Sequence, residues 1–200
     1  MRRYYNCRMK RKIRVGLDFD GVVAYNPFRI VRAPWAFFKS RILGIRKLTF
    51  FYPKTNFSKF IWKLMHDSSI FPAKGKNLLM DLVKNDLIEV HLVSGRFSFL
   101  DDHLYSWLDR YGMRKIFKSI NWNRKDKQPH KFKEELIRNK KIEIFVEDNW
   151  DIVEYLGESN KNYGKRVKIF WIYNLVDRFR KYEYKYPYLE KALEAIIKEQ

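Results

Sequence analysis

The chain has 200 residues, 46% of them hydrophobic, which suits one domain or one domain with a large insertion and excludes a wholly disordered chain. It carries 42 Lys and Arg against 23 Asp and Glu, a formal net charge of +19. This excess predicts attraction to polyanions: nucleic acid, an anionic membrane surface or phosphorylated substrates. The single cysteine, Cys7, excludes an internal disulfide framework and a zinc site built on several cysteines, and it fits a cytoplasmic location.

The N-terminal residues 1–12 are predicted to form a basic arm. Residues 1–14 hold seven Lys or Arg and no acid, and they lack the apolar stretch that a signal peptide needs. We interpret the arm as a solvated tail, with anion binding as the alternative. The chain contains no run of about 18 apolar residues, so no transmembrane helix is expected.

Apolar, β-branched runs alternate with amphipathic stretches along most of the chain. Strands are predicted over residues 13–17, 88–93, 142–146 and 167–172. Helices are predicted over residues 76–85, 100–111, 132–139 and 151–158. Such alternation indicates an α/β fold with a parallel sheet, in which ligands bind at the carboxyl ends of the strands.

Residues 25–75 interrupt this alternation and differ in composition. They hold ten Lys or Arg, one acid (Asp67) and twelve aromatic residues. Short helices are predicted within them over residues 35–43 and 58–65. We interpret the segment as an inserted helical cap that is basic and aromatic. The α/β core is then predicted to consist of residues 13–24 and 76–200.

The sharpest local feature is the pair Asp18 and Asp20, followed by Gly21, at the end of the first predicted strand. One carboxylate could bind a hard cation and attack phosphorus while the other moves a proton. Gly21 permits the tight turn that this arrangement needs. An ordinary acidic turn after a strand is the alternative, and the motif alone does not decide between the two.

Two further strand ends carry chemically capable side chains. Ser94 and Gly95 offer a hydroxyl and a backbone N–H that suit a phosphoryl oxygen, although a simple turn would use the same residues. Glu147 and Asp148 offer carboxylates for Mg²⁺, although Asp148 or Asn149 could instead cap the helix that follows. Lys131, near the start of a predicted helix, could neutralise a phosphate, or it could be one of many solvated lysines.

Taken in order, these motifs resemble the haloacid dehalogenase-like (HAD) superfamily, whose four motifs lie on successive strand ends. The matching segments are residues 15–21, residues 92–96, a lysine and residues 145–149, and the resemblance covers about residues 13–176. It implies a Rossmann-like parallel sheet with flanking helices and a small helical cap inserted after the first strand. The Glu-Asp-Asn ending of the last motif and the position of the insert resemble the 5'-nucleotidase-like members most.

The resemblance implies catalytic roles for three motif residues. Asp18 would be the nucleophile that forms an aspartyl-phosphate, and Asp20 would protonate the leaving oxygen and then activate water. Lys131 would orient Asp18 and offset charge, with Lys133 as the competing candidate because the helix register is open by a residue or two. The acid at position 20 favours phosphate-ester hydrolysis over carbon–halogen cleavage, because a leaving alkoxide needs a proton.

Substrate and metal contacts follow from the same resemblance. Ser94 and the Gly95 amide would hold the phosphoryl group, and Arg96 in the same motif is predicted to bind substrate. The predicted ligands of Mg²⁺ are, in chain order, Asp18, Asp20 through its backbone carbonyl, Glu147 and Asp148. The expected activity is therefore that of a Mg²⁺-dependent phosphomonoester hydrolase.

Three kinds of partner remain open for the basic, aromatic insert. A phosphorylated small molecule such as a nucleotide is the first, with aromatic rings stacking on its base. Nucleic acid is the second, as a binding partner or an end-phosphate substrate, since basic charge interleaved with aromatic residues suits single strands. Peripheral membrane contact is the third, through Phe37, Phe38, Phe50, Phe51 and neighbouring lysines. The oligomeric state is left open.

Overall fold

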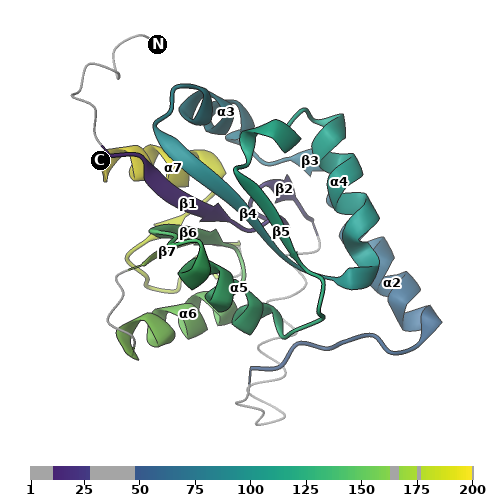
Figure 1. Ribbon diagram of the computed structural model, residues 1–200. Coiled ribbons are helices and arrows are strands. Elements are labelled where there is room, and N and C mark those ends of the chain that lie inside the picture. The colour runs from purple at the N-terminus through teal and green to yellow at the C-terminus, as the bar shows by residue number, and fades with distance from the viewer. Residues whose placement is uncertain (1–10, 28–47, 163–166, 175–176, 200) are drawn as a thin grey trace.

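Six parallel strands form one sheet at the centre of the molecule (Figure 1). The computed structural model describes residues 11–27, 48–162, 167–174 and 177–199. The strand order is β5-β4-β1-β6-β7-β8. The strand bounds are β1 Ile13–Leu17, β4 Ile88–Phe97, β5 Ser119–Asn123, β6 Ile144–Glu147, β7 Lys168–Ile172 and β8 Lys185–Tyr186. The fold is α/β with a Rossmann-like sheet, as predicted.

The strand β1 lies inside the sheet, and four of its five residues are buried. It pairs with β4 and β6, so that Val15 lies opposite Val90 on one side and Ile144 on the other. Gly16 points to the opposite face, where a Cβ built on it would lie 2.6 Å from the Phe145 ring. Burial on both faces is typical of parallel strands covered by helices.

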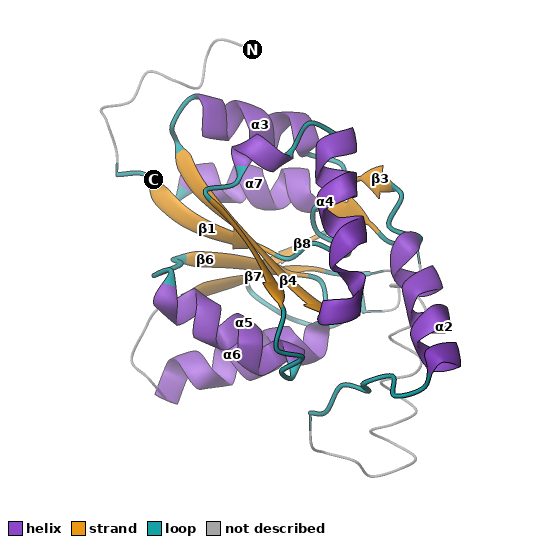
Figure 2. Cartoon of the chain, turned by 45° about the vertical axis from the view of Figure 1, so that its right-hand side comes forward, coloured by secondary structure: helices purple, strands orange, loops and turns teal. Residues whose placement is uncertain are grey.

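Helices cover both faces of the sheet (Figures 1 and 2). Their bounds are α3 Lys76–Lys84, α4 Asp101–Arg110, α5 Pro129–Asn139, α6 Trp150–Asn162 and α7 Leu189–Lys198. α3, α4 and α7 pack with Leu17 and Val146, whereas α5 and α6 pack with the neighbouring Phe145 on the other face. The two-residue period of the strands thus separates two apolar cores. Of the helices in the described residues, none is long and apolar enough to cross a bilayer.

One further helix, α2 (Asn56–Asp67), stands at the edge of the molecule beyond α4 (Figure 2). It begins after Thr55, whose side-chain oxygen accepts a hydrogen bond from the Ser58 N–H (3.2 Å), and Ser58 returns the contact in a capping box. A short antiparallel ribbon accompanies it. The remaining bounds are β2 Ala24–Tyr25, β3 Phe71–Pro72, η1 Ser98–Leu100 and η2 Arg114–Ile116. The helix predicted over residues 58–65 is thereby confirmed.

Some predictions fall outside what the structure describes. The helix predicted over residues 35–43 and residues 1–10 of the basic arm lie outside the described residues. At the end of the arm, Arg11 pairs with Glu143 and Lys12 pairs with Asp86. That residues 25–75 form a separate cap remains a prediction.

The predicted core strands and helices are confirmed, with differences at their ends and at the sheet edges. β4 continues past residue 93 through Ser94 and ends at Phe97. β5 and β8 were not predicted, because β5 reads Ser-Ile-Asn-Trp-Asn and β8 has two residues. Both strands lie at an edge of the sheet, where polar residues are tolerated and the apolar run that marks a core strand is absent.

Candidate active site

The predicted motif residues meet at the carboxyl edge of the sheet. Asp18 follows β1, Ser94 lies in β4 and Glu147 ends β6, and all three are buried. The Asp18 N–H donates a hydrogen bond to the Val146 carbonyl (3.0 Å), which holds the end of β1 beside the end of β6. The parallel topology therefore brings together side chains that lie far apart in the sequence.

Three buried carboxylates form the centre of this edge. Asp18, Glu147 and Asp148 each offer an oxygen, and these oxygens all lie within 4.8 Å of one another. Burial raises the pKa of Asp18 well above its usual value, and the charge of Glu147 raises it further. The buried ammonium of Lys133 pairs with two of these three carboxylates, those of Asp18 and Glu147. Clustered oxygen donors with excess negative charge suit a hard divalent cation such as Mg²⁺.

The turn after Asp18 is shaped to bring Asp148 close. Gly21 has φ +82, in the left-handed region that favours glycine, and its N–H donates to the Ala24 carbonyl (2.7 Å). A Cβ built on Gly21 would lie 2.2 Å from Asp148 Oδ2. Glycine is therefore required both by the backbone conformation and by the approach of this carboxylate.

A lysine completes the cluster, and it is Lys133. Its Nζ lies 3.0 Å from Asp18 Oδ2 and 2.6 Å from Glu147 Oε2. Burial lowers the pKa of this ammonium, but the charges of Asp18 and Glu147 outweigh burial and raise it above the usual value. The lysine thus stays protonated while bridging two carboxylates.

The placement of Lys131 at the site was wrong. Helix α5 begins at Pro129, and its buried face carries Pro129, His130, Lys133 and Ile137. Lys131 lies on the exposed face of the same helix. Because α5 begins at Pro129, its helical period turns Lys133 toward the sheet and Lys131 away from it. The sequence pattern alone did not determine where the helix begins.

The acidic motif also starts the next helix, so the helix-capping interpretation of it is confirmed and the metal-binding interpretation stays a prediction. Glu147 Oε1 accepts hydrogen bonds from the backbone N–H groups of Asp148 (3.2 Å) and Asn149 (3.1 Å). The Asn149 side chain accepts one from the Asp151 N–H (3.0 Å) in the first turn of α6. The capping residue is Asn149, which leaves the Asp148 carboxylate in the acidic cluster.

Asp20 is held by a bidentate ion pair with Arg96. Arg96 Nε donates to Asp20 Oδ2 (2.8 Å) and Nη2 donates to Oδ1 (2.7 Å), and Ser69 Oγ donates to Oδ1 (2.6 Å). Burial alone would raise the pKa of Asp20, but the Arg96 guanidinium outweighs it and holds the pKa far below its usual range. Asp20 is therefore a carboxylate in this arrangement.

The expectation that Arg96 is free to contact substrate does not match its surroundings. Besides Asp20, its Nη2 donates to the His66 carbonyl (2.9 Å) and its Nη1 donates to His103 Nδ1 (2.9 Å). The guanidinium also lies over the Phe19 ring, 4.7 Å from its centroid. The guanidinium is thus occupied by protein groups. Arg96 lies two residues after Ser94 in β4, and its side chain reaches Asp20 and α2.

Replacing Arg96 by Met is expected to lower the free energy of unfolding at neutral pH by about 3–5 kcal/mol, because a buried charge loses its partner. The pKa of Asp20 is depressed in the folded state. The ion pair therefore stabilises the protein fully above the pKa that Asp20 has in the unfolded chain, about 4, and it stabilises the protein less as the pH falls below that value. Urea unfolding of Arg96→Met and wild type at neutral and acidic pH measures both effects.

The matched control for this prediction is Arg114→Met. Arg114 pairs with Asp109 at 2.8 Å, but both side chains are about half exposed, so the expected loss is about 1 kcal/mol or less. An Arg96→Met loss no larger than that of Arg114→Met, or a loss that grows as pH falls, would contradict the assignment.

Gly95 lies close to Lys133, and Ser94 precedes Gly95 in β4. Ser94 is fully buried, and its Oγ accepts a hydrogen bond from the Arg96 N–H (3.3 Å). A Cβ built on Gly95 would lie 3.1 Å from Pro129 Cβ and 3.4 Å from Lys133 Cε. Gly95 thus allows the start of α5 to approach β4, and this approach delivers Lys133 to the site.

Sequence reasoning missed the contribution of the insert to this edge. Ser69 is fully buried and donates to Asp20, and the backbone of His66 accepts from Arg96. His103 in α4 adds a third contact to the same guanidinium. The contacts of Ser69 and His66 join residues 49 and 30 positions apart in the sequence, so no local motif could have revealed either residue.

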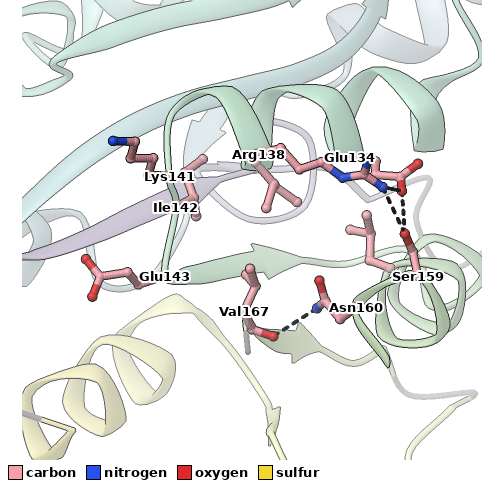
Figure 3. Close-up of a pocket in the computed structure, with 10 residues that line it drawn as sticks. Glu134, Arg138, Lys141, Ile142, Glu143, Ser159, Asn160 and Val167 are labelled. Atoms are coloured by element: carbon pink, nitrogen blue, oxygen red, sulfur yellow. Dashed lines mark hydrogen bonds and ion pairs between the residues drawn. The ribbon is translucent and has the colours of Figure 1, made fainter. Parts of the chain in front are cut away.

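The cavity in Figure 3 lies away from these residues. Its volume is about 320 Å³, and it opens between the second halves of α5 and α6, next to Ile142 and Val167, which precede β6 and β7. Glu134 in its wall is engaged by Arg138 and by Ser159 Oγ. The cavity therefore lies at the amino edge of the sheet, opposite the acidic cluster.

No protein-family model matches the sequence, and no curated protein matches it. Solved structures match in fold. The putative HAD-hydrolase YfnB from Bacillus subtilis, bound to magnesium, has a TM-score of 0.58 at 11% identity over 94% of this chain and 100% of its own. CbbY from Rhodobacter sphaeroides, in complex with phosphate, has a TM-score of 0.55 at 13% identity, over 90% of this chain and 96% of its own.

A third match names the superfamily as well. A HAD-superfamily hydrolase from Ehrlichia chaffeensis has a TM-score of 0.52 at 15% identity, covering 96% of this chain and 98% of its own. Together these matches show that the chain has the fold of the HAD-superfamily hydrolases. The resemblance carried by the motifs is confirmed at this level, and the 5'-nucleotidase-like subtype stays a prediction.

Proposed function

We propose that the chain is a divalent-metal-dependent phosphomonoester hydrolase, with Mg²⁺ as its metal and Asp18 as its nucleophile. The observation that carries the proposal is the buried cluster of Asp18, Glu147 and Asp148 with Lys133 at the carboxyl edge of the sheet. Phosphoryl transfer depends mainly on positioning and on charge stabilisation by metal and cations, and this cluster offers both.

The metal would be held by Asp18 and Asp148, with Glu147 direct or through water and the Asp20 carbonyl as a further ligand. When bound, it would neutralise charge on the phosphoryl oxygens. The Asp18 carboxylate oxygen would form the bond to phosphorus as the ester oxygen departs. Lys133 would fix the Asp18 carboxylate and offset the negative charge that accumulates beside it.

Ser94 and the Gly95 N–H would bind the phosphoryl oxygens. Asp20 would move the protons: as a carboxylate it would take one from the water that hydrolyses the aspartyl-phosphate. Its other task is to protonate the leaving oxygen, for which Asp20 must first carry a proton. The ion pair with Arg96 keeps Asp20 ionised, so that pair has to be loosened before this step. Arg96 would thereby act on the reaction through Asp20 and not by contact with substrate.

The proposed substrate is a nucleotide or another small phosphate ester, as in the 5'-nucleotidase-like members that the motifs resemble. Two structural neighbours support the chemistry, since one was solved with magnesium and another with phosphate. An end-phosphorylated nucleic acid is the second candidate, favoured by the net charge of +19.

The test is phosphate release from a panel of phosphomonoesters with Mg²⁺ and with EDTA. The panel contains nucleoside 5'- and 3'-monophosphates, sugar phosphates and phosphate-ended oligonucleotides. We expect Mg²⁺-dependent release with a preference for one small-ester class. Preference for oligonucleotides, with release that falls steeply as salt rises, would favour the second candidate. No release from any ester would overturn the proposed function.

A further inference from the structure

The helix α2 directs an apolar face to solvent. Phe57, Phe60, Ile61 and Leu64 follow the spacing of one helix face, and they are 74%, 62%, 39% and 60% exposed. Trp62 and His66 of the same helix are half-buried, and their ring centroids lie 5.7 Å apart. No residue of α2 is buried, so the hydrophobic face of an amphipathic helix points outward.

Further apolar side chains continue this face beyond the helix. Phe51 before α2 is exposed, and its ring lies 5.9 Å from that of Trp62. Ile70 and Phe71 follow α2, and Tyr25 pairs with Phe71 in the β2–β3 ribbon; all three are exposed. The ribbon and α2 lie on the same side of the molecule in both views (Figures 1 and 2). Exposed apolar groups that gather on one side of a molecule mark interaction surfaces.

The charges near this face are positive. Lys54 precedes the helix and Lys63 lies within it, and both are exposed. The first turn of α2 carries no acid, and Asp67 at its end lies 3.7 Å from His103 Nε2. The whole chain has a formal net charge of +19. The partner of this face is therefore expected to be anionic as well as apolar.

These two requirements discriminate among partners. A second copy of the chain would bring like-charged lysines and two net charges of +19 together. A nucleic acid would supply anions and flat bases but no hydrocarbon for Ile61 and Leu64. An anionic bilayer supplies both headgroup charge and an apolar interior, and it takes up helices with exposed Phe and Leu and nearby lysines.

We propose that α2 and the β2–β3 ribbon form a docking surface for an anionic lipid bilayer, on which the protein lies peripherally. Phe57, Phe60 and Leu64 enter the interface, and Lys54 and Lys63 contact the headgroups. The same helix end is bonded to the candidate active site, since the His66 carbonyl accepts from Arg96. The docking helix is therefore connected through Arg96 to Asp20. The inference does not depend on the proposed function.

The test is co-sedimentation of the full chain with vesicles of phosphatidylcholine alone and of phosphatidylcholine with phosphatidylglycerol. The wild type is expected to sediment with the anionic vesicles. The triple variant Phe57→Ser, Phe60→Ser, Leu64→Ser is expected to partition at least about 1,000-fold more weakly, because each of the three inserted side chains contributes about tenfold or more. Lys54→Glu with Lys63→Glu is expected to remove the preference for anionic vesicles.

The matched control is Phe179→Ser, which removes another strongly exposed ring away from α2 and should bind like the wild type. All three replaced α2 side chains are exposed, so circular dichroism should report an unchanged fold. The proposal is overturned if the wild type does not bind anionic vesicles or if the triple variant binds equally well. It is also overturned if the triple variant loses binding to a single-stranded oligonucleotide, or loses the ability to form a dimer, while its vesicle binding is unaffected.

Discussion

Replacing Asp18 by Asn is expected to abolish phosphate release, with a loss of at least roughly 1,000-fold in kcat, because the amide cannot form the bond to phosphorus. The fold should survive. Burial and the charge of Glu147 already disfavour the ionised form of Asp18, so a neutral side chain of the same shape relieves repulsion. Phosphate release by purified variant and wild type, with near-ultraviolet circular dichroism as the fold check, measures the effect.

The matched control for Asp18→Asn is Asp81→Asn, which changes an acid on the helix α3, away from the carboxyl edge of the sheet. It should release phosphate at the wild-type rate. Full activity in a folded Asp18→Asn variant would show that Asp18 is not the nucleophile, and the aspartyl-phosphate route would be abandoned.

Replacing Lys133 by Met is expected to lower kcat by about 100-fold or more, the loss typical of removing one group that stabilises charge in the transition state. Lys131→Met changes the same residue type on the exposed face of the same helix and should leave kcat unchanged. Steady-state kinetics with saturating Mg²⁺ compares the two variants.

The Lys133 variant also leaves Asp18 and Glu147 without their shared cation, so its stability has to be measured separately. We expect urea unfolding at neutral pH to show a loss of about 3–5 kcal/mol without added metal, and saturating Mg²⁺ should recover part of it, since a ligand that binds the folded state stabilises it. A folded Lys133→Met variant with wild-type kcat, or a Lys131→Met variant with an equal loss, would contradict the assignment.

Most of the fold could be predicted because its signals are local. β1 and β6 are mainly apolar runs that are followed by or end in acids, and α3 has the helical period. β5 could not be recognised, since an edge strand such as Ser119–Asn123 needs no apolar run. The length of β4 was also underestimated, because Ser94 and Gly95 are typical of a turn, whereas here they continue a strand that pairs with β5.

The candidate site was predicted as a set of residue types but not in its pairings. Asp18, Glu147 and Asp148 were identified because each follows a predicted strand, and parallel strands end at one edge. The choice between Lys131 and Lys133 depended on where α5 begins, and helix boundaries are the least certain part of a sequence-based prediction. The Arg96–Asp20 pair and the contact of Ser69 depend on tertiary packing alone, so Arg96 was predicted to contact substrate and not Asp20.

The central claim is that Asp18, beside a divalent metal, accepts a phosphoryl group. Fluorine NMR of the protein with beryllium fluoride tests it most directly, because beryllium trifluoride imitates a phosphoryl group bonded to a carboxylate. We expect bound fluorine signals in the wild type with Mg²⁺ that vanish with EDTA and do not form in Asp18→Asn. Signals that persist in Asp18→Asn, or their absence from the wild type with saturating Mg²⁺, would contradict the account.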